Sequence, residues 1–236
     1  MSKLFLQAEW RKLLMLNYLV DRSLLEPYLP YHTEIDLYKD RCYISLVGFM
    51  FLDTKLKGLR IPFHTTFEEV NLRFYVRHYE NGAWKRGVVF IKEIVSKPAL
   101  TFIANTLYKE NYETFPMDHS WRTNDHSLFV EYKWKKKAWN SINVKVDRPS
   151  TKIDDGSEEE FITEHYWGYT KITDKVTSEY RVEHPRWEVY ETTEYSIDVD
   201  FRDVYGKDFE FLQSETPKSV FLAEGSEIQV KEAKLI

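Results

Sequence analysis

The chain has 236 residues, 43% of them hydrophobic and 16% aromatic, a composition that supports a packed core and excludes a disordered protein. Its formal net charge of −5 excludes a global basic field of the kind that recruits nucleic acid or an acidic membrane surface. The one cysteine, Cys42, excludes an intramolecular disulfide.

The length of the chain predicts one large domain over residues 1–236. The amino terminus becomes acidic at Glu9, too soon for a secretory signal. No apolar run approaches the roughly 20 residues that cross a bilayer. These features predict a cytoplasmic protein without a membrane segment.

The first part of the chain alternates apolar segments with turn residues. Residues 9–20 predict an opening strand or short helix, and residues 41–50 predict a strand. Between them, Asp21 is a suitable N-cap for a short helix that runs through Leu29 and ends at Pro30.

The clearest local pattern is a β-hairpin. Residues 67–76 and 84–95 both have strand character, and the Asn81-Gly82 pair between them is typical of a tight turn. The preceding segment, residues 51–63, contains Gly and Pro as breakers and is predicted to be a loop.

Apolar residues at helical spacing predict a helix from Ser96, as the N-cap, to about Lys109. The apolar positions are Leu100, Ile103, Ala104, Leu107 and Tyr108. This is the most regular helical pattern in the chain.

The second half of the chain is dominated by strands. They are predicted over residues 127–134, 138–146, 170–182 and 187–200, with a short pair near Val220 and Ile228. Ser157 and Glu160 fit a capping box, which predicts a helix through about Tyr166. Together the elements predict a mainly β fold, bordering on α+β, built as an antiparallel β-barrel or curved sheet with two or three helices.

The strand over residues 67–76 carries the main candidate site. Side chains alternate along a strand, so Glu69, Asn71, Arg73 and Tyr75 share one face while four apolar residues share the other. If the polar face lines a pocket, Arg73 could bind a substrate carboxylate and Glu69 could act as acid or base, with Asn71 and Tyr75 as further pocket residues. The alternative is an ordinary solvent-exposed face of an antiparallel strand.

Other motifs argue against several functions. The seven histidines form no HxxxH pair or Cys/His cluster, so no metal site is predicted. No Gly-rich phosphate loop and no Gly-x-Ser-x-Gly elbow are present, and no cofactor is predicted. Residues 133–139 (KWKKKAW) mix lysines with indoles, which can stack bases, but their place between two strands favours a solvated hairpin tip. No nucleic-acid partner is predicted.

Four stretches resemble one known family: residues 67–76 (FEEVNLRFYV), 86–90 (RGVVF), 161–166 (FITEHY) and 182–187 (VEHPRW). The opening Asn17-Tyr18, followed by Leu25, Leu29 and Pro30, also fits. The chain resembles the YqjF-like family of uncharacterised bacterial proteins, whose fold is related to acetoacetate decarboxylase. The resemblance covers most of the chain and implies a β-barrel with a central cavity.

The resemblance also implies candidate catalytic residues. Acetoacetate decarboxylases place a glutamate on the strand that residues 67–69 resemble, which points to Glu69. They use a Schiff-base lysine in a Glu-x-x-x-x-Pro-Lys context, and its nearest counterpart here is Lys92, without a preceding proline. Lys92 shares strand parity with Val88, Phe90 and Ile94, so alternation points it into an apolar face, although a lysine near a strand end usually reaches water.

Two functions follow from these observations. The first is a small-molecule-binding protein that takes an oxo- or carboxylate-bearing ligand, with decarboxylase- or aldolase-like chemistry as its catalytic form. The second is a non-catalytic ligand-binding or assembly module, including a homo-oligomer, favoured by the missing proline before Lys92 and by the many aromatic residues.

Overall fold

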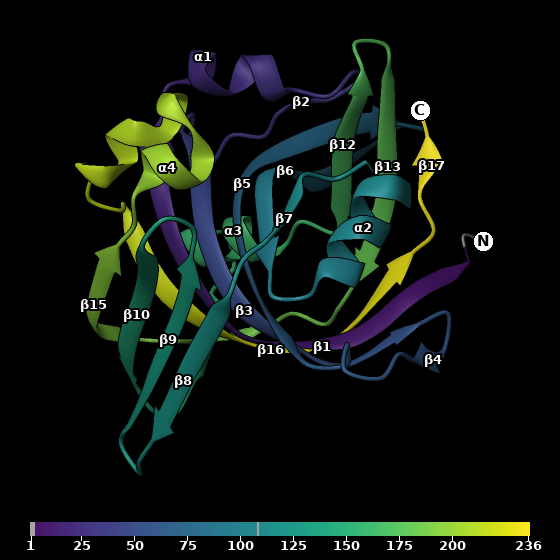
Figure 1. Ribbon diagram of the computed structural model, residues 1–236. Helices are drawn as coiled ribbons and strands as arrows, with labels where there is room; N and C mark the ends of the chain where they lie inside the picture. The colour runs from purple at the N-terminus through teal and green to yellow at the C-terminus, as the bar shows by residue number, and fades with distance from the viewer. Residues whose placement is uncertain (1–2, 108) are drawn as a thin grey trace.

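The computed structural model describes residues 3–107 and 109–236. Its strands form one large curved sheet and one four-stranded sheet packed beside it (Figure 1). The large sheet is built on β1 (Leu4–Val20), β3 (Cys42–Leu56), β5 (Phe67–Glu80), β6 (Ala83–Val95), β12 (Trp167–Thr173), β13 (Val176–Glu183) and β16 (Ser219–Lys231). The order is β16-β1-β3-β5-β6-β12-β13, and β13 also pairs with β16, so the strand order closes on itself.

Short strands extend this sheet at its edges: β2 (Glu34–Ile35), β4 (Leu59–Arg60), β7 (Tyr112–Thr114), β11 (Thr151–Lys152), β14 (Glu188–Tyr190) and β17 (Lys234–Leu235). The second sheet has the order β15-β10-β9-β8, from β8 (Met117–Thr123), β9 (Ser127–Lys135), β10 (Trp139–Asp147) and β15 (Thr192–Asp198). Most neighbouring strands are antiparallel, whereas β12 and β7 pair with β6 in parallel. The mainly β prediction is confirmed, as a curved mixed sheet.

The helical segments are short and lie around the sheets: α1 (Arg22–Leu25), η1 (Glu26–Tyr28), α2 (Pro98–Leu107), α3 (Glu158–Thr163), α4 (Phe201–Tyr205) and η2 (Lys207–Gln213). Asp21 caps α1 by accepting from the Ser23 amide, as predicted. Ser157 likewise caps α3 by accepting from the Glu160 amide. Within residues 3–107 and 109–236, no helix has the length and apolar character needed to span a bilayer.

The two faces of the large sheet have separate cores. On β5, the side chains of Val70, Leu72, Phe74 and Val76 are fully buried in one cluster with residues of the second sheet such as Trp134. The opposite, concave face belongs to a second cluster that includes Phe49, Phe51, Phe67 and Tyr75. Because a sheet with apolar residues on both faces has to be covered on both, the polar residues of β5 are enclosed.

The hairpin prediction is confirmed. β5 and β6 pair from Glu69↔Val95 to Glu80↔Ala83, and Asn81 (φ 53°) and Gly82 (φ 82°) form the turn. Both central residues have positive φ, as a type I′ turn requires. The predicted helix after β6 is also present, although it begins at Pro98 and the Ser96 hydroxyl donates to Glu68 instead of capping it. Tyr108 lies outside the described residues.

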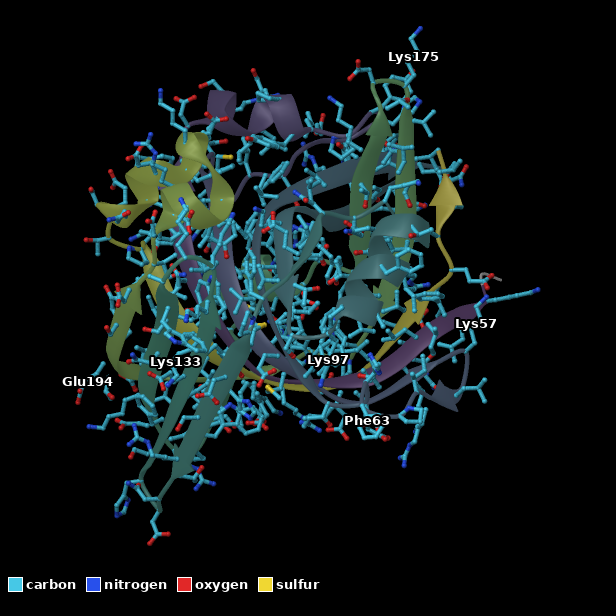
Figure 2. The ribbon with its side chains drawn as sticks, in the orientation of Figure 1. Lys57, Phe63, Lys97, Lys133, Lys175 and Glu194 are labelled. Atoms are coloured by element: carbon cyan, nitrogen blue, oxygen red, sulfur yellow. The ribbon has the colours of Figure 1, made fainter. Side chains whose placement is uncertain are left out.

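Several boundaries predicted from the sequence are wrong. Residues 51–63 are not one loop, because β3 continues to Leu56 and turns at Lys57-Gly58 into β4. Residues 170–182 are two strands, with Lys175 at the tip between β12 and β13 (Figure 2). The helix predicted to reach Tyr166 ends at Thr163.

Further along, the segment over residues 187–200 changes sheets between β14 and β15. The short pair predicted near Val220 and Ile228 is the single long strand β16. The strand β8 and the helical segments α4 and η2 were not predicted. Local sequence patterns do not show which strands continue past a bulge or a turn, because that depends on the partner strand.

Gly225 allows β16 to pack closely against β1. This residue has φ 82°, and a Cβ atom there would lie 2.0 Å from the Trp10 carbonyl oxygen. We expect Gly225→Ala to lower the free energy of unfolding by about 2 kcal/mol, since it combines a left-handed backbone with a steric clash. Gly58→Ala is the matched control, because Gly58 has the same φ of 82° and a Cβ added there would meet no atom within 4 Å. Urea denaturation of both variants tests this, and equal losses would contradict it.

Candidate functional site

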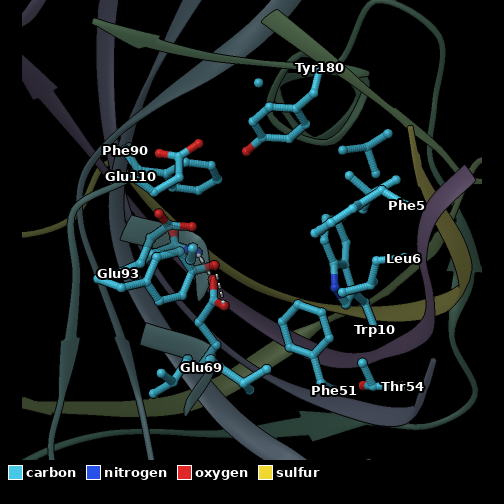
Figure 3. Close-up of a pocket in the computed structure, with 18 of the residues that line it drawn as sticks. Phe5, Leu6, Trp10, Phe51, Thr54, Glu69, Phe90, Glu93, Glu110 and Tyr180 are labelled. Atoms are coloured by element: carbon cyan, nitrogen blue, oxygen red, sulfur yellow. Dashed lines mark hydrogen bonds between the residues drawn. The ribbon is translucent and has the colours of Figure 1, made fainter. Parts of the chain in front are cut away.

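The concave side of the large sheet encloses a cavity of about 160 Å³. Its lining comes from β1, β3, β5, β6, β7, β12, β13 and β16, with Leu100, Ile103 and Ala104 of α2 closing part of it. This volume is on the order of the ~150 Å³ that hold a benzene-sized molecule in an engineered protein cavity. Figure 3 shows Glu93 and Glu110 together with Phe90 on one wall, and Phe5, Leu6 and Trp10 on the opposite wall.

The polar side chains of β5 face this enclosed side of the sheet. Glu69, Asn71 and Arg73 line the cavity, and all three are buried. Tyr75 is also buried but lies beyond the lining, where its hydroxyl is 2.7 Å from the Ser45 hydroxyl and its ring packs on His165 at 4.8 Å. The structure therefore brings three of the four candidate residues of β5 to one cavity.

Glu69 sits among hydrogen-bond donors. The Asn71 amide donates to one carboxylate oxygen at 3.0 Å, and the Tyr112 hydroxyl donates to the other at 3.2 Å. Burial raises the pKa of Glu69 to about 7, although these two hydrogen bonds and the nearby Arg73 charge act in the opposite direction. A carboxyl group with a pKa near neutrality can both donate and accept a proton at neutral pH.

Two further glutamates on the same wall, Glu93 and Glu110, were not predicted from the sequence. Burial, together with the Glu110 and Glu69 carboxylates, raises the pKa of Glu93 well above its ordinary value. Burial also raises the pKa of Glu110 to about 7, while Thr170 donates to it at 2.7 Å. Like charges in a buried site cannot all ionise, so at neutral pH Glu93 retains its proton and Glu69 and Glu110 are only partly ionised.

A β-bulge decides which residues of β6 face the cavity. β5 pairs Leu72 with Lys92 but the next residue, Arg73, with Phe90, so Ile91 is the extra residue. Before the bulge Val88 and Phe90 face inward, and after it Glu93 and Val95 do. The prediction that Lys92 points to the same face as Val88 and Phe90 assumed an unbroken strand. The bulge at Ile91 shifts the alternation by one residue, so Lys92 points to the opposite face.

Lys92 lies away from the cavity, on the opposite face of the large sheet, whose core includes Val204 and Trp134. Its ammonium group is 2.7 Å from the Glu113 carboxylate and donates to the Val204 carbonyl at 2.7 Å. The lining that the described residues provide contains no lysine. Of the two catalytic candidates, the structure brings only Glu69 to the cavity.

Arg73 is the least compensated charge at the site. It is only 8% exposed, and it forms no hydrogen bond or salt bridge with any residue in 3–107 or 109–236. Its guanidinium carbon lies 5.8 Å from the centroid of the Tyr75 ring. A buried guanidinium without a paired acid is costly, and a bidentate anion would match its geometry.

A second polar network supports this end of the cavity. His165, which lines the cavity, is 3.1 Å from Asp36 through Nε2, and Arg86 donates to the same carboxylate oxygen at 2.6 Å. Burial lowers the pKa of His165 to about 4, so its ring is neutral at physiological pH. Burial would raise the pKa of Asp36, but hydrogen bonds from His165 and Arg86 bring it below the ordinary value. The network holds His165 against Tyr75.

The remaining sequence motifs lie elsewhere. Among the residues that the structure describes, no group of three His, Cys, Asp or Glu side chains is arranged to hold a metal ion. The basic run forms the β9–β10 hairpin tip, where Lys136 donates to the Asp203 carbonyl at 2.7 Å and Lys137 pairs with the Asp203 carboxylate at 2.8 Å. Trp134 is fully buried in the cluster that also contains Val70 and Leu72, so it is not available for stacking on a base.

Comparisons with solved structures identify the fold. The acetoacetate decarboxylase of Legionella pneumophila matches with a TM-score of 0.67 at 9% identity, over 99% of this chain and 88% of that one. An acetoacetate decarboxylase-like enzyme of Sphingomonas wittichii RW1 matches with a TM-score of 0.68 at 11% identity, over 98% and 93%. The enduracididine biosynthesis enzyme MppR, complexed with pyruvate, matches with a TM-score of 0.65 at 12% identity, over 100% and 91%. At these identities the likeness shows the fold alone.

Comparisons of sequence identify the family. The uncharacterized protein YqjF of Bacillus subtilis (strain 168) is 27% identical over 186 residues, which cover 76% of this chain and 73% of that protein. This confirms the resemblance read from the four sequence stretches. The family model DUF2071, described as an uncharacterized conserved protein, matches residues 7–227, and the chain belongs to this family.

Proposed function

We propose that this protein binds a small oxo- or carboxylate-bearing molecule in the cavity, with Arg73 holding the carboxylate. The observation that carries the proposal is the burial of Arg73 beside the cavity without a hydrogen bond or salt bridge to any described residue. Bidentate pairing with a ligand carboxylate would supply the missing counter-charge. The pyruvate complex of MppR, a protein of similar fold, is consistent with a ligand of this class.

Glu69 is the residue that we propose exchanges a proton with the ligand. It lies two residues from Asn71 and four from Arg73 on the same strand face, and its pKa of about 7 suits a general acid or base. Because the described lining contains no lysine, the proposed chemistry is proton transfer at an oxo acid instead of imine formation. Decarboxylase- or aldolase-like turnover would then depend on Glu69.

The lack of a lysine in the described lining also favours a second candidate function, a non-catalytic carrier of the same ligands. Incubation with acetoacetate or pyruvate in deuterated water, followed by NMR, separates the two. Loss of substrate, or hydrogen exchange beside the oxo group, that disappears in Glu69→Gln supports the enzyme. Saturable binding without either change supports the carrier.

The anion-binding role of Arg73 is tested by Arg73→Gln. We expect binding of pyruvate and acetoacetate to weaken about tenfold to a hundredfold, because a hydrogen-bonded charge pair is worth about 1.5–3 kcal/mol. Arg77→Gln is the matched control on the same strand, since Arg77 pairs with Glu34 at 2.6 Å outside the cavity lining. Isothermal titration calorimetry measures both dissociation constants. Unchanged affinity in Arg73→Gln would contradict the proposal.

A further inference from the structure

Two oxygen atoms on the acidic wall of the cavity have no hydrogen-bond partner among the described residues. They are Oδ1 of Asn71 and Oε2 of Glu93. Asn71 is 1% exposed and Glu93 2%, and the two residues line the cavity directly opposite each other across β5 and β6. The proton that Glu93 retains does not join them, because no described acceptor lies within hydrogen-bond distance of Oε2. Since buried polar atoms are almost always hydrogen-bonded, these neighbouring oxygens indicate a missing donor.

The side chains around these two oxygens are also acidic. Glu69 and Glu110 line the same cavity, and Figure 3 shows Glu93 and Glu110 next to each other with Glu69 below them. None of the three carboxyl groups forms a salt bridge with a described residue, and burial raises the pKa of each. This wall therefore lacks a positive charge that would pair with its carboxyl groups.

The acidic wall adjoins Arg73. Arg73 is the next inward-facing residue of β5 after Asn71, roughly 7 Å further along the strand. Its charge acts on this wall, since it lowers the pKa of Glu69 against the effect of burial. An anion-binding group and an unpaired acidic wall are therefore neighbours in one cavity. A molecule with a positive and a negative group separated by one or two carbon atoms would match both.

We propose that the ligand is a small amino acid, whose ammonium group donates to Asn71 Oδ1 and Glu93 Oε2 while its carboxylate pairs with Arg73. The proposal rests on the proposed function, because Arg73 is taken to hold the carboxylate. It adds the substrate class: a carboxylate with a primary ammonium group on its α- or β-carbon. An ammonium group is a compact charge with three N–H donors, which suits neighbouring acceptors. Of the two candidate functions, this ligand suits the carrier, because proton transfer at an oxo group does not apply to it.

The test compares propionate, L-alanine and β-alanine by isothermal titration calorimetry on the full chain at pH 7. All three have three carbons and a carboxylate, and only the amino acids carry an ammonium group. At least one amino acid should bind about tenfold or more tighter than propionate, the effect of one hydrogen bond between charged groups. If both bind no tighter than propionate, the amino-acid proposal is overturned and the role of Arg73 stands. If propionate, pyruvate and acetoacetate all fail to bind, the proposed function fails as well.

Proton release provides a second readout on the unmodified protein. A cation beside the carboxyl groups lowers their pKa, so binding of the amino acid should release up to about one proton, whereas propionate should release none. Titrations in phosphate and in Tris, which differ in ionisation enthalpy, measure the number of protons released. Binding of the amino acid without proton release would show that its ammonium group lies away from the acidic wall, and would overturn the proposal.

A pair of variants locates the ammonium group. Glu93→Leu removes one of the two acceptors, and it should reduce the advantage of the amino acid over propionate about tenfold. Glu113→Leu is the matched control on β7, because the Glu113 carboxylate pairs with Lys92 outside the cavity lining. The control should keep both the advantage and the proton release. An undiminished advantage in Glu93→Leu would contradict the placement of the ammonium group.

Discussion

The free energy of unfolding is expected to decrease by on the order of 3 kcal/mol for each of Glu69 and Glu110 as the pH rises from 4.5 to 7. The folded-state pKa of each carboxyl is about 7, above the ordinary 4.5. Between these values the unfolded chain releases a proton that the folded chain retains. The stabilisation by retained protons is therefore complete below pH 4.5 and is lost as the pH rises through about 7.

Other buried groups act in the opposite direction over part of this range. Burial lowers the pKa of His165 and of His184 from 6.5 to about 4, so the stability that these neutral rings contribute is lost as the pH falls below 6.5. The informative quantity is therefore the difference between a variant and the parent protein, measured at the same pH.

Glu69→Gln and Glu110→Gln isolate the carboxyl groups. Each variant should be less sensitive to pH than the parent between pH 5 and about 8 in urea denaturation, because an amide does not ionise. Glu194→Gln, at an exposed residue that pairs with Lys145 on the second sheet, controls for the loss of one surface charge. A parent-like profile in both cavity variants would show that these carboxyl groups do not retain protons in the fold.

Arg73→Met is expected to raise the free energy of unfolding by about 3 kcal/mol while removing carboxylate binding. Arg73 is buried and lacks a hydrogen bond or salt bridge to any described residue, so the ligand-free protein bears the cost of an uncompensated charge. Methionine fills a similar space without that cost. A gain in stability coupled to a loss of binding is typical of residues kept for function.

The measurement for Arg73→Met is best made at pH 5 without ligand. Glu69 is then mostly protonated, so its attraction to the guanidinium does not offset the cost of burial. Arg73→Lys is the control, because it retains the positive charge and should not gain stability. Destabilisation of Arg73→Met by several kcal/mol would show that Arg73 holds the fold together.

The pattern of residues 67–76 was sufficient to predict which side chains share a face. Strict alternation assigns Glu69, Asn71 and Arg73 to one side and the apolar residues to the other, and the structure shows that arrangement. The Asn81-Gly82 turn was equally predictable, because few residue pairs adopt two successive positive φ values. Both features depend on local backbone geometry.

Which other residues line the cavity could not be predicted from the sequence. Glu110 and Tyr112 come from a segment without a clear local pattern, and they reach Glu69 only because β7 pairs in parallel with β6, with Tyr112 opposite Glu93. The parity of Lys92 failed for a related reason, since the bulge at Ile91 exists only against β5.

The sequence by itself determined the mainly β character, the polar and apolar faces of residues 67–76, the tight turn and the family. The tertiary structure alone decided that the polar face of β5 is enclosed, that Glu93 replaces Lys92 at the cavity wall, and that Arg73 has no paired acid among the described residues. Alternation is set by the geometry of a single strand, whereas burial, bulges and charge pairing depend on segments that are distant in the chain.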